Sequence, residues 1–327
     1  MRRVAGGLLL GFVLLALLAP SVSPNDPQVQ SPDRTFAPPM RVHVRDSEGW
    51  QAPFVYRQVL VDRISRTYTD SHDVRVPLQW FVGGRLVSVA ADRGPLLLCG
   101  ADAVGRDLCA RLAYGARLSL GVAVLGACGA LLLGAWLGAT AGTFGGRVDT
   151  LVMTVADFVL VLPVVYLAIV LRATRPLVMD TGEMFVLMSA IFAGAAWPDV
   201  ARGVRSVVAS ERSRDYAEAA RAVGAGPCRL VGHLLPAAYG FLRIEFVLLV
   251  PALLIAESTL SFVGFGFEGA IPSWGGLLKD SEALTAMYSA PWLLIPAVAL
   301  FVVVLALQTL AGAGASAVNI DRARTHR

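Results

Sequence analysis

The sequence predicts an all-α polytopic membrane protein with six transmembrane helices and a small β-rich extracytoplasmic insertion between helices 1 and 2. Three observations support this fold class. Hydrophobic residues make up 56% of the 327 residues and charged residues only 16%, whereas about a quarter of an ordinary soluble domain is charged. The apolar residues are gathered into runs approaching the roughly 20 residues that cross a bilayer as a helix. A long polar segment separates the first run from the others.

The first apolar run extends from Val4 to Ala19 behind two arginines and ends at Pro20. A run of this length also suits the apolar region of a signal peptide. No Ala-x-Ala cleavage site follows, and Pro24 comes soon after the small serines at 21 and 23. We therefore favour a retained N-terminal anchor over residues 1–20.

Residues 21–112 are rich in proline and charge, which predicts an extracytoplasmic segment that faces water. Met40–Val44 and Arg75–Val82 have the character of strands, and the Gly83–Gly84 pair after the second suggests a turn. Cys99 and Cys109 in this segment could pair outside the membrane, but the sequence favours free thiols.

Residues 113–314 form the predicted membrane core, followed by a cytoplasmic tail at 315–327. We expect the span that begins at Met184 to continue past Pro198 toward Val208, because it is otherwise short. The predicted spans of the core are Leu118–Ala141, Leu151–Leu171, Met184–Trp197, Phe241–Ile255 and Pro291–Leu310.

The distribution of arginine predicts the orientation. Arginines gather in the loop at 198–234, in the C-terminal tail and at the N-terminus, and such residues favour the cytoplasmic side. Six crossings place both termini together, so both are predicted to be cytoplasmic. The arginines of residues 21–112 do not oppose this, because long segments are translocated largely regardless of charge.

Small residues recur every four positions in the second span and line one face of the predicted helix. Small residues at this spacing let another helix approach closely. They are also simply common in membrane helices, but their register favours a packing face against a helix of the bundle or of a partner subunit. The face consists of Gly126, Ala130, Gly134, Gly138 and Gly142.

The loop at 205–236 predicts a compact helix–turn–helix. Helix formers follow Asp215, and Gly224 can adopt the left-handed turn at the end of the first helix. Pro227 suits the first turn of a second helix, which Pro236 is expected to end, and Arg214 and Glu218 have the i,i+4 spacing of an ion pair. The pair could dock on a partner or lie on the lipid headgroups.

Several kinds of chemistry lack a sequence basis. Lys279 is the only lysine of the chain, and it is not in the Gly-x-x-x-x-Gly-Lys-Ser/Thr setting of a nucleotide-binding P-loop. The cysteines and histidines have no metal-ligand spacing, and the scattered basic residues give no nucleic-acid patch. We expect no enzyme activity, no catalytic residue, no metal site and no nucleic-acid partner.

Glu218-Ala219-Ala220, then Gly224, then Leu235-Pro236 resembles the EAA loop of binding-protein-dependent ABC-importer permeases. The resemblance implies that this loop supplies the coupling helix that sits in a groove of the cytoplasmic ATPase. The implied coupling residues are Asp215, Tyr216, Glu218, Ala219, Ala220, Gly224, Leu235 and Pro236.

Two further stretches resemble the dipeptide/oligopeptide branch of this family. Residues 100–107, followed by Arg111–Leu120, are similar to its Gly-Thr-Asp-x-x-Gly-Arg-Asp region, with Ala101 in place of threonine. Residues 256–266 and 272–275 resemble its segment after the fifth span. Together the motifs imply the second, C-type permease subunit. The 100–107 motif residues are Gly100, Asp102, Gly105, Arg106 and Asp107.

Ionisable residues within membrane helices are candidates for function. For Asp157, which falls with Asp149 and Pro163 where the family has aspartates and a proline, we favour a structural hydrogen bond to a neighbouring helix over a contact in the translocation pathway. For Glu257, gating and helix capping are equally supported. The translocation or gate candidates are Asp157, Glu257, Ser261 and Gly264.

The resemblance implies a permease of the bacterial plasma (inner) membrane that imports peptides or peptide-like solutes. Its implied partners are a second homologous permease subunit, cytoplasmic ABC ATPase subunits, an extracytoplasmic solute-binding protein and the lipid bilayer. ATP and Mg would bind to the ATPase subunits and no cofactor to this chain. Alternatives are a related importer for another solute, such as nickel chelates, and a stand-alone secondary transporter, although no inverted repeat is evident.

Overall fold

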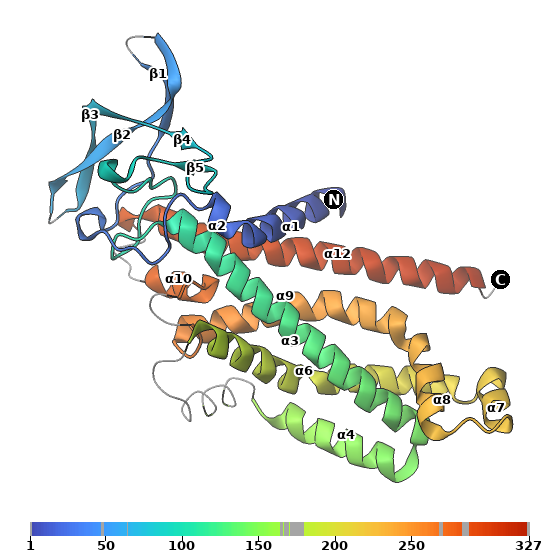
Figure 1. Cartoon of the computed structure of the whole chain (residues 1–327). Helices are drawn as coiled ribbons and strands as arrows, with labels where there is room; N and C mark the ends of the chain where they lie inside the picture. Colours follow the sequence, from blue (N-terminus) through green and yellow to red (C-terminus); the bar gives the residue numbers. More distant parts are fainter. Residues whose placement is uncertain are drawn as a thin grey trace. The chain divides into compact units, whose positions relative to one another are not determined.

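The computed structural model describes residues 2–46, 49–63, 65–163, 166, 170, 180–267, 271–282 and 288–325 (Figure 1). The chain divides into two compact units, which we describe separately. Unit 1 comprises Met1–Gly7, Leu120–Glu257 and Val304–Arg327, and unit 2 comprises Leu8–Ser119 and Ser258–Val303.

Most of the described residues are helical. The α-helices are α1 (Arg2–Leu17), α2 (Ala19–Val22), α3 (Leu108–Phe144), α4 (Gly146–Val161), α6 (Thr181–Glu211), α7 (Asp215–Ala222), α8 (Pro227–Leu234), α9 (Tyr239–Val263), α10 (Trp274–Asp280) and α12 (Ile295–Thr325). Short 3-10 turns lie at Pro32–Arg34, Ala91–Arg93, Leu235–Ala238 and Pro291–Leu294. The strands are β1 (Val42–Asp46), β2 (Gly49–Asp62), β3 (Thr67–Pro77), β4 (Gln79–Trp80) and β5 (Val87–Ser88).

Among the described residues, 4 helical stretches are long and apolar enough to cross a membrane, as expected for a polytopic membrane protein. They are Leu108–Phe144, Thr181–Glu211, Cys228–Val263 and Pro291–Gly312, and the apolar helix at Arg3–Leu17 is shorter. Helix α4 covers the first part of the predicted span Leu151–Leu171, and much of the remainder lies outside the described residues. The count of six crossings therefore stays a prediction.

Helix α6 continues through Pro198 to Glu211, as the sequence predicts. Proline removes one backbone hydrogen-bond donor, a loss that helices in membrane bundles tolerate where neighbouring groups compensate. The Pro198 side chain is itself buried. The continuous helix joins the apolar part of α6 directly to the loop that precedes α7.

Helices α3 and α6 approach closely through glycines of α3. A Cβ atom added to Gly138 would lie 2.4 Å from the carbonyl oxygen of Ala201, and one added to Gly134 would lie 2.5 Å from Cβ of Val200. Real Cβ atoms do not approach other atoms this closely, so only glycine permits the observed distance between the helices. Both contacts lie within unit 1.

The remaining members of the small-residue face continue the same contact. A Cβ atom on Gly126 would lie 3.0 Å from Cβ of Phe192, and one on Gly142 would lie 2.9 Å from the carbonyl oxygen of Arg205. Ala130, on the same face, is fully buried. The face thus packs against α6 of the same chain.

Helix α4 packs beside α6 (Figure 1). Ala156 of α4 and Trp197 and Ala201 of α6 form a small buried apolar cluster. Two ion pairs, described below, join the same two helices. Helix α6 is therefore the element of unit 1 that both α3 and α4 contact.

Unit 2 contains the strands, of which β1, β2 and β3 form an antiparallel sheet in that order, and β4 and β5 form a two-stranded ladder (Figure 1). Strands occur at both stretches that the sequence marked as strand-like. One face of the sheet covers a buried cluster that includes Met40, Val55, Val76, Leu96 and Leu97. This core fixes the chain that leads to the first turn of α3.

The packing face predicts different effects for two glycines. Gly138→Ala should destabilise the protein by about 1–3 kcal/mol, because the added methyl group overpacks the contact with α6. The matched variant is Gly194→Ala in α6, where an added Cβ meets nothing within 4 Å. Thermal unfolding of the detergent-solubilised protein measures both. Equal unfolding temperatures for the two variants would contradict the packing face.

Candidate functional site

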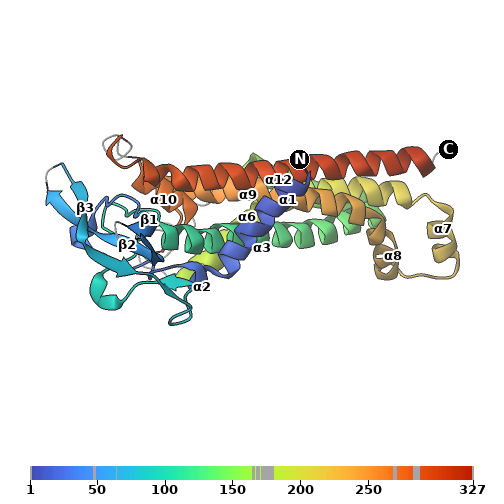
Figure 2. The same ribbon diagram turned by 90° about the horizontal axis from the view of Figure 1, so that it is seen from above.

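Helices α7 and α8 lie side by side and are joined by a tight turn (Figure 2). Gly224 has φ +82°, a conformation that glycine adopts without steric cost. Its N–H donates to the carbonyl of Arg221 at 2.9 Å, and the N–H of Ala225 donates to Ala220 at 3.0 Å. Pro227 occupies the first turn of α8, so the predicted helix–turn–helix is present.

Apolar side chains hold the α7–α8 pair against α6. Ala217 of α7 and Leu234 of α8 are fully buried in a cluster that contains Val204 and Val208 of α6. Ala139 of α3 joins the same cluster. The pair is thereby attached to the two helices that meet through the glycine face.

The other side of the α7–α8 pair is exposed. Glu218 and Ala219 are both exposed, and the Glu218 side chain makes no hydrogen bond or ion pair with another described residue. Tyr216 donates its hydroxyl hydrogen to Glu211 at 3.0 Å, and Val223 is 89% exposed. The predicted coupling residues Asp215, Tyr216, Glu218, Ala219, Gly224 and Pro236 are exposed, and Ala220 and Leu235 are partly buried against the apolar cluster.

One local prediction for this loop is wrong. Arg214 pairs with Glu211 at 3.5 Å and not with Glu218, because Arg214 is the N-cap residue with extended backbone and lies outside the helix. Helix α8 ends at Leu234, just before Pro236, as the sequence predicts, and the 3-10 turn Leu235–Ala238 then leads directly into α9. Proline is tolerated there because backbone N–H groups in the first turn of a helix have no hydrogen-bond acceptor within the helix, so the missing N–H loses no bond.

Ion pairs join α4 to α6 in unit 1. Asp157 contacts Arg202, which matches the favoured interpretation of a hydrogen bond to a neighbouring helix. Asp149 accepts from Nε of Arg205 at 2.7 Å. Both arginines belong to α6, so the two acidic positions of α4 serve the same helix contact.

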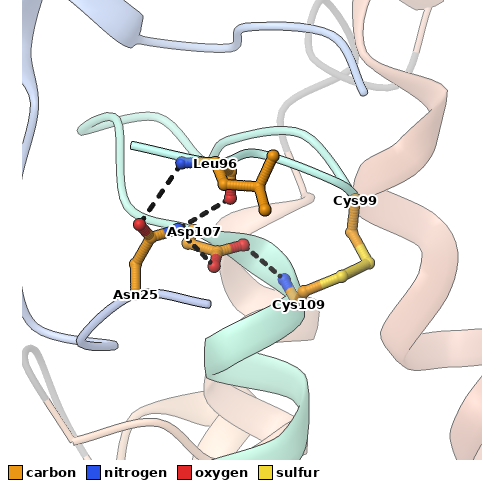
Figure 3. The surroundings of a disulfide bond; sticks show 5 residues. All are labelled: Asn25, Leu96, Cys99, Asp107 and Cys109. Carbon is orange, nitrogen blue, oxygen red and sulfur yellow. Dashed lines mark hydrogen bonds between the residues drawn. A yellow bond between two sulfur atoms is a disulfide. The ribbon is translucent and has the colours of Figure 1, made fainter. Parts of the chain in front are cut away.

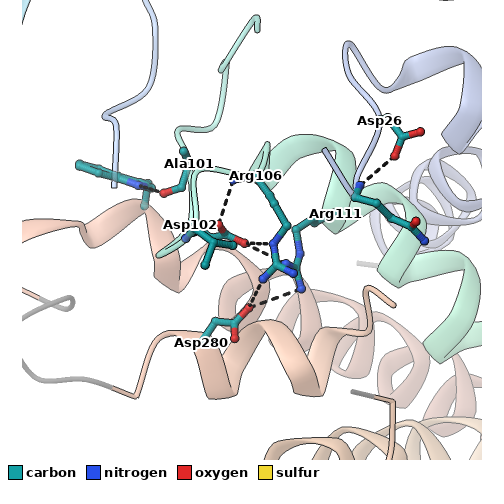
Figure 4. A network of polar contacts seen from close by, with 9 residues as sticks. Asp26, Ala101, Asp102, Arg106, Arg111 and Asp280 are labelled. Atoms are coloured by element: carbon teal, nitrogen blue, oxygen red, sulfur yellow. Dashed lines mark hydrogen bonds and ion pairs between the residues drawn. The ribbon is translucent and has the colours of Figure 1, made fainter. Parts of the chain in front are cut away.

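In unit 2, the 100–107 motif forms a turn that precedes α3 and centres on Asp102 (Figure 4). The Asp102 carboxylate is fully buried. It accepts from the backbone N–H of Val104 at 3.0 Å and of Arg106 at 2.9 Å, from Nε of Arg106 at 2.7 Å and from Nη1 of Arg111 at 2.8 Å. The motif thus places two guanidinium groups side by side.

Two glycines allow this turn to form. Gly100 has φ +82° and Gly105 has φ +77°. A Cβ atom on Gly105 would also lie 1.9 Å from the carbonyl oxygen of Ser31. Both positions therefore need glycine for backbone conformation and for space, since a Cβ atom on Gly100 would lie 2.9 Å from the carbonyl oxygen of Ala37.

Asp107, the last residue of the motif, faces Asn25 and the start of α3 (Figure 3). Asn25 Nδ2 donates to Asp107 at 2.8 Å, and the N–H of Cys109 donates to it at 2.9 Å. Burial raises the pKa of the Asp107 carboxyl from 3.8 to about 6, and these hydrogen bonds offset part of the rise. Asp107 is therefore a structural anchor between two segments of unit 2.

Cys99 and Cys109 form a disulfide (Figure 3), so the prediction of free thiols is wrong. The turn at Gly100 and the start of α3 bring the two Cα atoms to 5.2 Å, within the usual range for a disulfide. Sequence spacing alone does not reveal this approach, because it depends on the turn conformation.

The other three gate candidates are Glu257 and Ser261, which lie in the last turns of α9, and Gly264, which directly follows it. Glu257 is fully buried within α9, before the end of that helix at Val263. Ser261 Oγ accepts from the N–H of Phe267 at 3.3 Å, and Gly264 ends the helix with φ +97°. Among the described residues, no group of three or more His, Cys, Asp or Glu is arranged to hold a metal ion.

Residues 130–317 match the family model described as the binding-protein-dependent transport system inner membrane component. The chain belongs to this family. The matched region contains the α7–α8 pair, Asp157, Glu257, Ser261 and Gly264, whereas the 100–107 motif precedes it.

Individual relatives also match about three fifths or more of the chain. The chain is 35% identical over 197 residues to the oligopeptide transport system permease protein OppC of Haemophilus influenzae, covering 60% of this chain and 61% of the relative. It is 34% identical over 194 residues to the dipeptide transport system permease protein DppC of Bacillus subtilis, covering 59% and 58%. For OppC of Mycobacterium tuberculosis, the identity is 34% over 220 residues, covering 66% and 72%. The match thus spans about three fifths of the length of the first two.

Sequence reasoning did not identify three polar residues that this family member uses in unit 2. Asn25 bonds to Asp107, Arg111 bonds to Asp102, and Asp280 lies 3.4 Å from both Arg106 and Arg111. The only available signal was the position of Arg111 within the extended motif. Asp280 and Asn25 reach the motif through long-range contacts that no local sequence pattern predicts.

The raised pKa of Asp107 predicts a pH-dependent stability. Between pH 4 and 6 the folded protein binds this proton more strongly than the unfolded chain, so stability should fall as pH rises, by up to about 3 kcal/mol. Asp107→Asn should remove this slope, whereas Asp26→Asn, at an exposed carboxylate, should retain it. Unfolding temperatures measured from pH 4 to 7 provide the comparison. An unchanged slope in Asp107→Asn would contradict the assignment.

Proposed function

We propose that this chain is a transmembrane permease subunit of an ABC importer for peptides or peptide-like solutes. The α7–α8 pair carries this proposal, because its apolar side is fixed to α6 while its other side presents exposed Glu218 and Val223. Such a surface can transmit movement of a cytoplasmic ATPase to the membrane helices. The names of the oligopeptide and dipeptide relatives support a peptide cargo.

In this proposal the chain performs no chemistry. A second homologous permease subunit completes the pathway, an extracytoplasmic binding protein delivers the solute, and ABC ATPase subunits bind ATP and Mg. The chain would cross the inner membrane six times with both termini cytoplasmic, and residues 21–112 would lie outside. The coupling loop at 205–236 would then face the ATPase.

The turn of the coupling loop gives a direct test. Gly224→Val should abolish uptake of a labelled dipeptide while the protein remains in the membrane, because a β-branched residue at φ +82° strains the turn between α7 and α8. Gly226→Val is the matched control, since Gly226 has φ −63° and an added Cβ meets nothing within 4 Å. Normal uptake in Gly224→Val would contradict the role of the turn.

Charge reversal tests the exposed face without disturbing the core. Glu218→Arg should abolish uptake and ATPase coupling, because Glu218 is exposed and has no partner among the described residues that the change would break. Glu183→Arg, at an exposed position in the first turn of α6, should leave uptake intact. Normal coupled transport in Glu218→Arg would argue against docking through α7.

The energy source distinguishes the importer from a secondary transporter. Uptake by cells that express the complete system should survive an uncoupler and stop when ATP is depleted. The opposite pattern would indicate a stand-alone transporter driven by an ion gradient and would overturn the proposed function.

A further inference from the structure

Unit 2 contains a cavity of about 410 Å³ whose lining includes residues of the 100–107 motif, the start of α3, the end of α9 and α10. This volume lies in the range of small-ligand sites. Several of its lining side chains are charged, although only 16% of the residues of the chain are charged. The residues relevant here are Arg106, Arg111, Ser261, Gly264, Lys279 and Asp280.

Among the described residues, the acidic partners of the two arginines of the cavity are Asp102 and Asp280. Asp102 binds both guanidinium groups through short hydrogen bonds, but Asp280 lies 3.4 Å from each arginine and keeps 33% of its side chain exposed. The Arg111 side chain is only 2% exposed, and its Nε has no hydrogen-bond partner among the residues that the structure describes. A buried charged donor without an acceptor is costly, which points to an acceptor supplied from outside the chain.

Lys279 supplies a third cation at the same cavity. Its ammonium group lies beside Gly264, at 2.8 Å from the position of an added Cβ, and makes no hydrogen bond or ion pair with another described residue. Together with Arg106 and Arg111 it gives three positive charges, and Asp102 and Asp280 give two negative charges. The net charge of this cluster is therefore about one positive charge.

We propose that this cavity binds the carboxylate group of a peptide solute, an inference that rests on the proposed function. Guanidinium groups match the planar geometry of a carboxylate, and Arg111 Nε and Lys279 Nζ are donors that it can engage. A net charge near +1 suits a monoanion better than a dianionic phosphate. Asp280 competes with the incoming carboxylate for the same arginines.

The single lysine makes this site directly measurable. The purified full-length chain in phosphatidylcholine nanodiscs is treated with an acetylating N-hydroxysuccinimide ester, and mass spectrometry follows acetylation of Lys279. The α-amino group of the chain serves as the internal reference. At ten times its Kd, N-acetyl-dialanine should slow acetylation of Lys279 about tenfold, whereas N-acetyl-dialanine amide, which lacks the carboxylate, should not.

Two variants test the role of the competing carboxylate. Asp280→Asn should lower the concentration of N-acetyl-dialanine needed for half-protection, because it removes the negative charge nearest the two arginines. The matched control is Glu282→Gln, at an exposed carboxylate outside the cavity lining, which should leave that concentration unchanged. Equal effects of the two variants would show a general charge effect and overturn the assignment.

Further outcomes separate this inference from the proposed function, because protection of Lys279 requires neither ATP nor transport. Equal protection by the acid and the amide, or no protection in a chain that supports ATP-dependent uptake, would overturn the cavity assignment alone. Protection only when phosphatidylglycerol is added to the nanodiscs would assign the site to a lipid headgroup and likewise overturn it. Protection without ATP-dependent uptake would support the site while the proposed function fails.

Discussion

The close contact between α3 and α6 is the constraint on which the rest of unit 1 depends. Lipid gives apolar helices no hydrophobic drive to associate, so packing must come from close van der Waals contact. Gly134 and Gly138 provide it by admitting α6 to distances that any side chain would prevent. The same α6 carries both ion pairs from α4 and the apolar cluster that holds α7 and α8. A movement of the α7–α8 pair would therefore act first on α6.

Features set by local chemistry could be predicted from the sequence. The spacing of small residues identified the packing face of α3, and Gly224 and Pro227 located the turn between α7 and α8, because left-handed glycine and helix-starting proline are local signals. The continuation of α6 past Pro198 followed from the shortness of the apolar run. In each case neighbours along the chain determine the conformation.

Features set by contacts between distant segments could not be predicted in this way. The disulfide depends on the turn at Gly100, and Asp280 joins the 100–107 motif across a sequence separation of 174 residues from Arg106. Arg214 illustrates the same limit at short range, since its i,i+4 spacing from Glu218 applies only if both residues lie inside the helix. The cavity lined by Lys279 likewise exists only after segments that are far apart in the sequence meet.

The proposed function requires that the exposed side of the α7–α8 pair contacts an ATPase. A photoreactive amino acid at Val223, which is 89% exposed, tests this most directly when it is activated in membranes that contain the complete transport system. We expect a cross-linked product with the P-loop ATPase subunit, and none from the same group at Tyr288, which is 88% exposed. Active uptake without a cross-link from Val223 to the ATPase would contradict the claim.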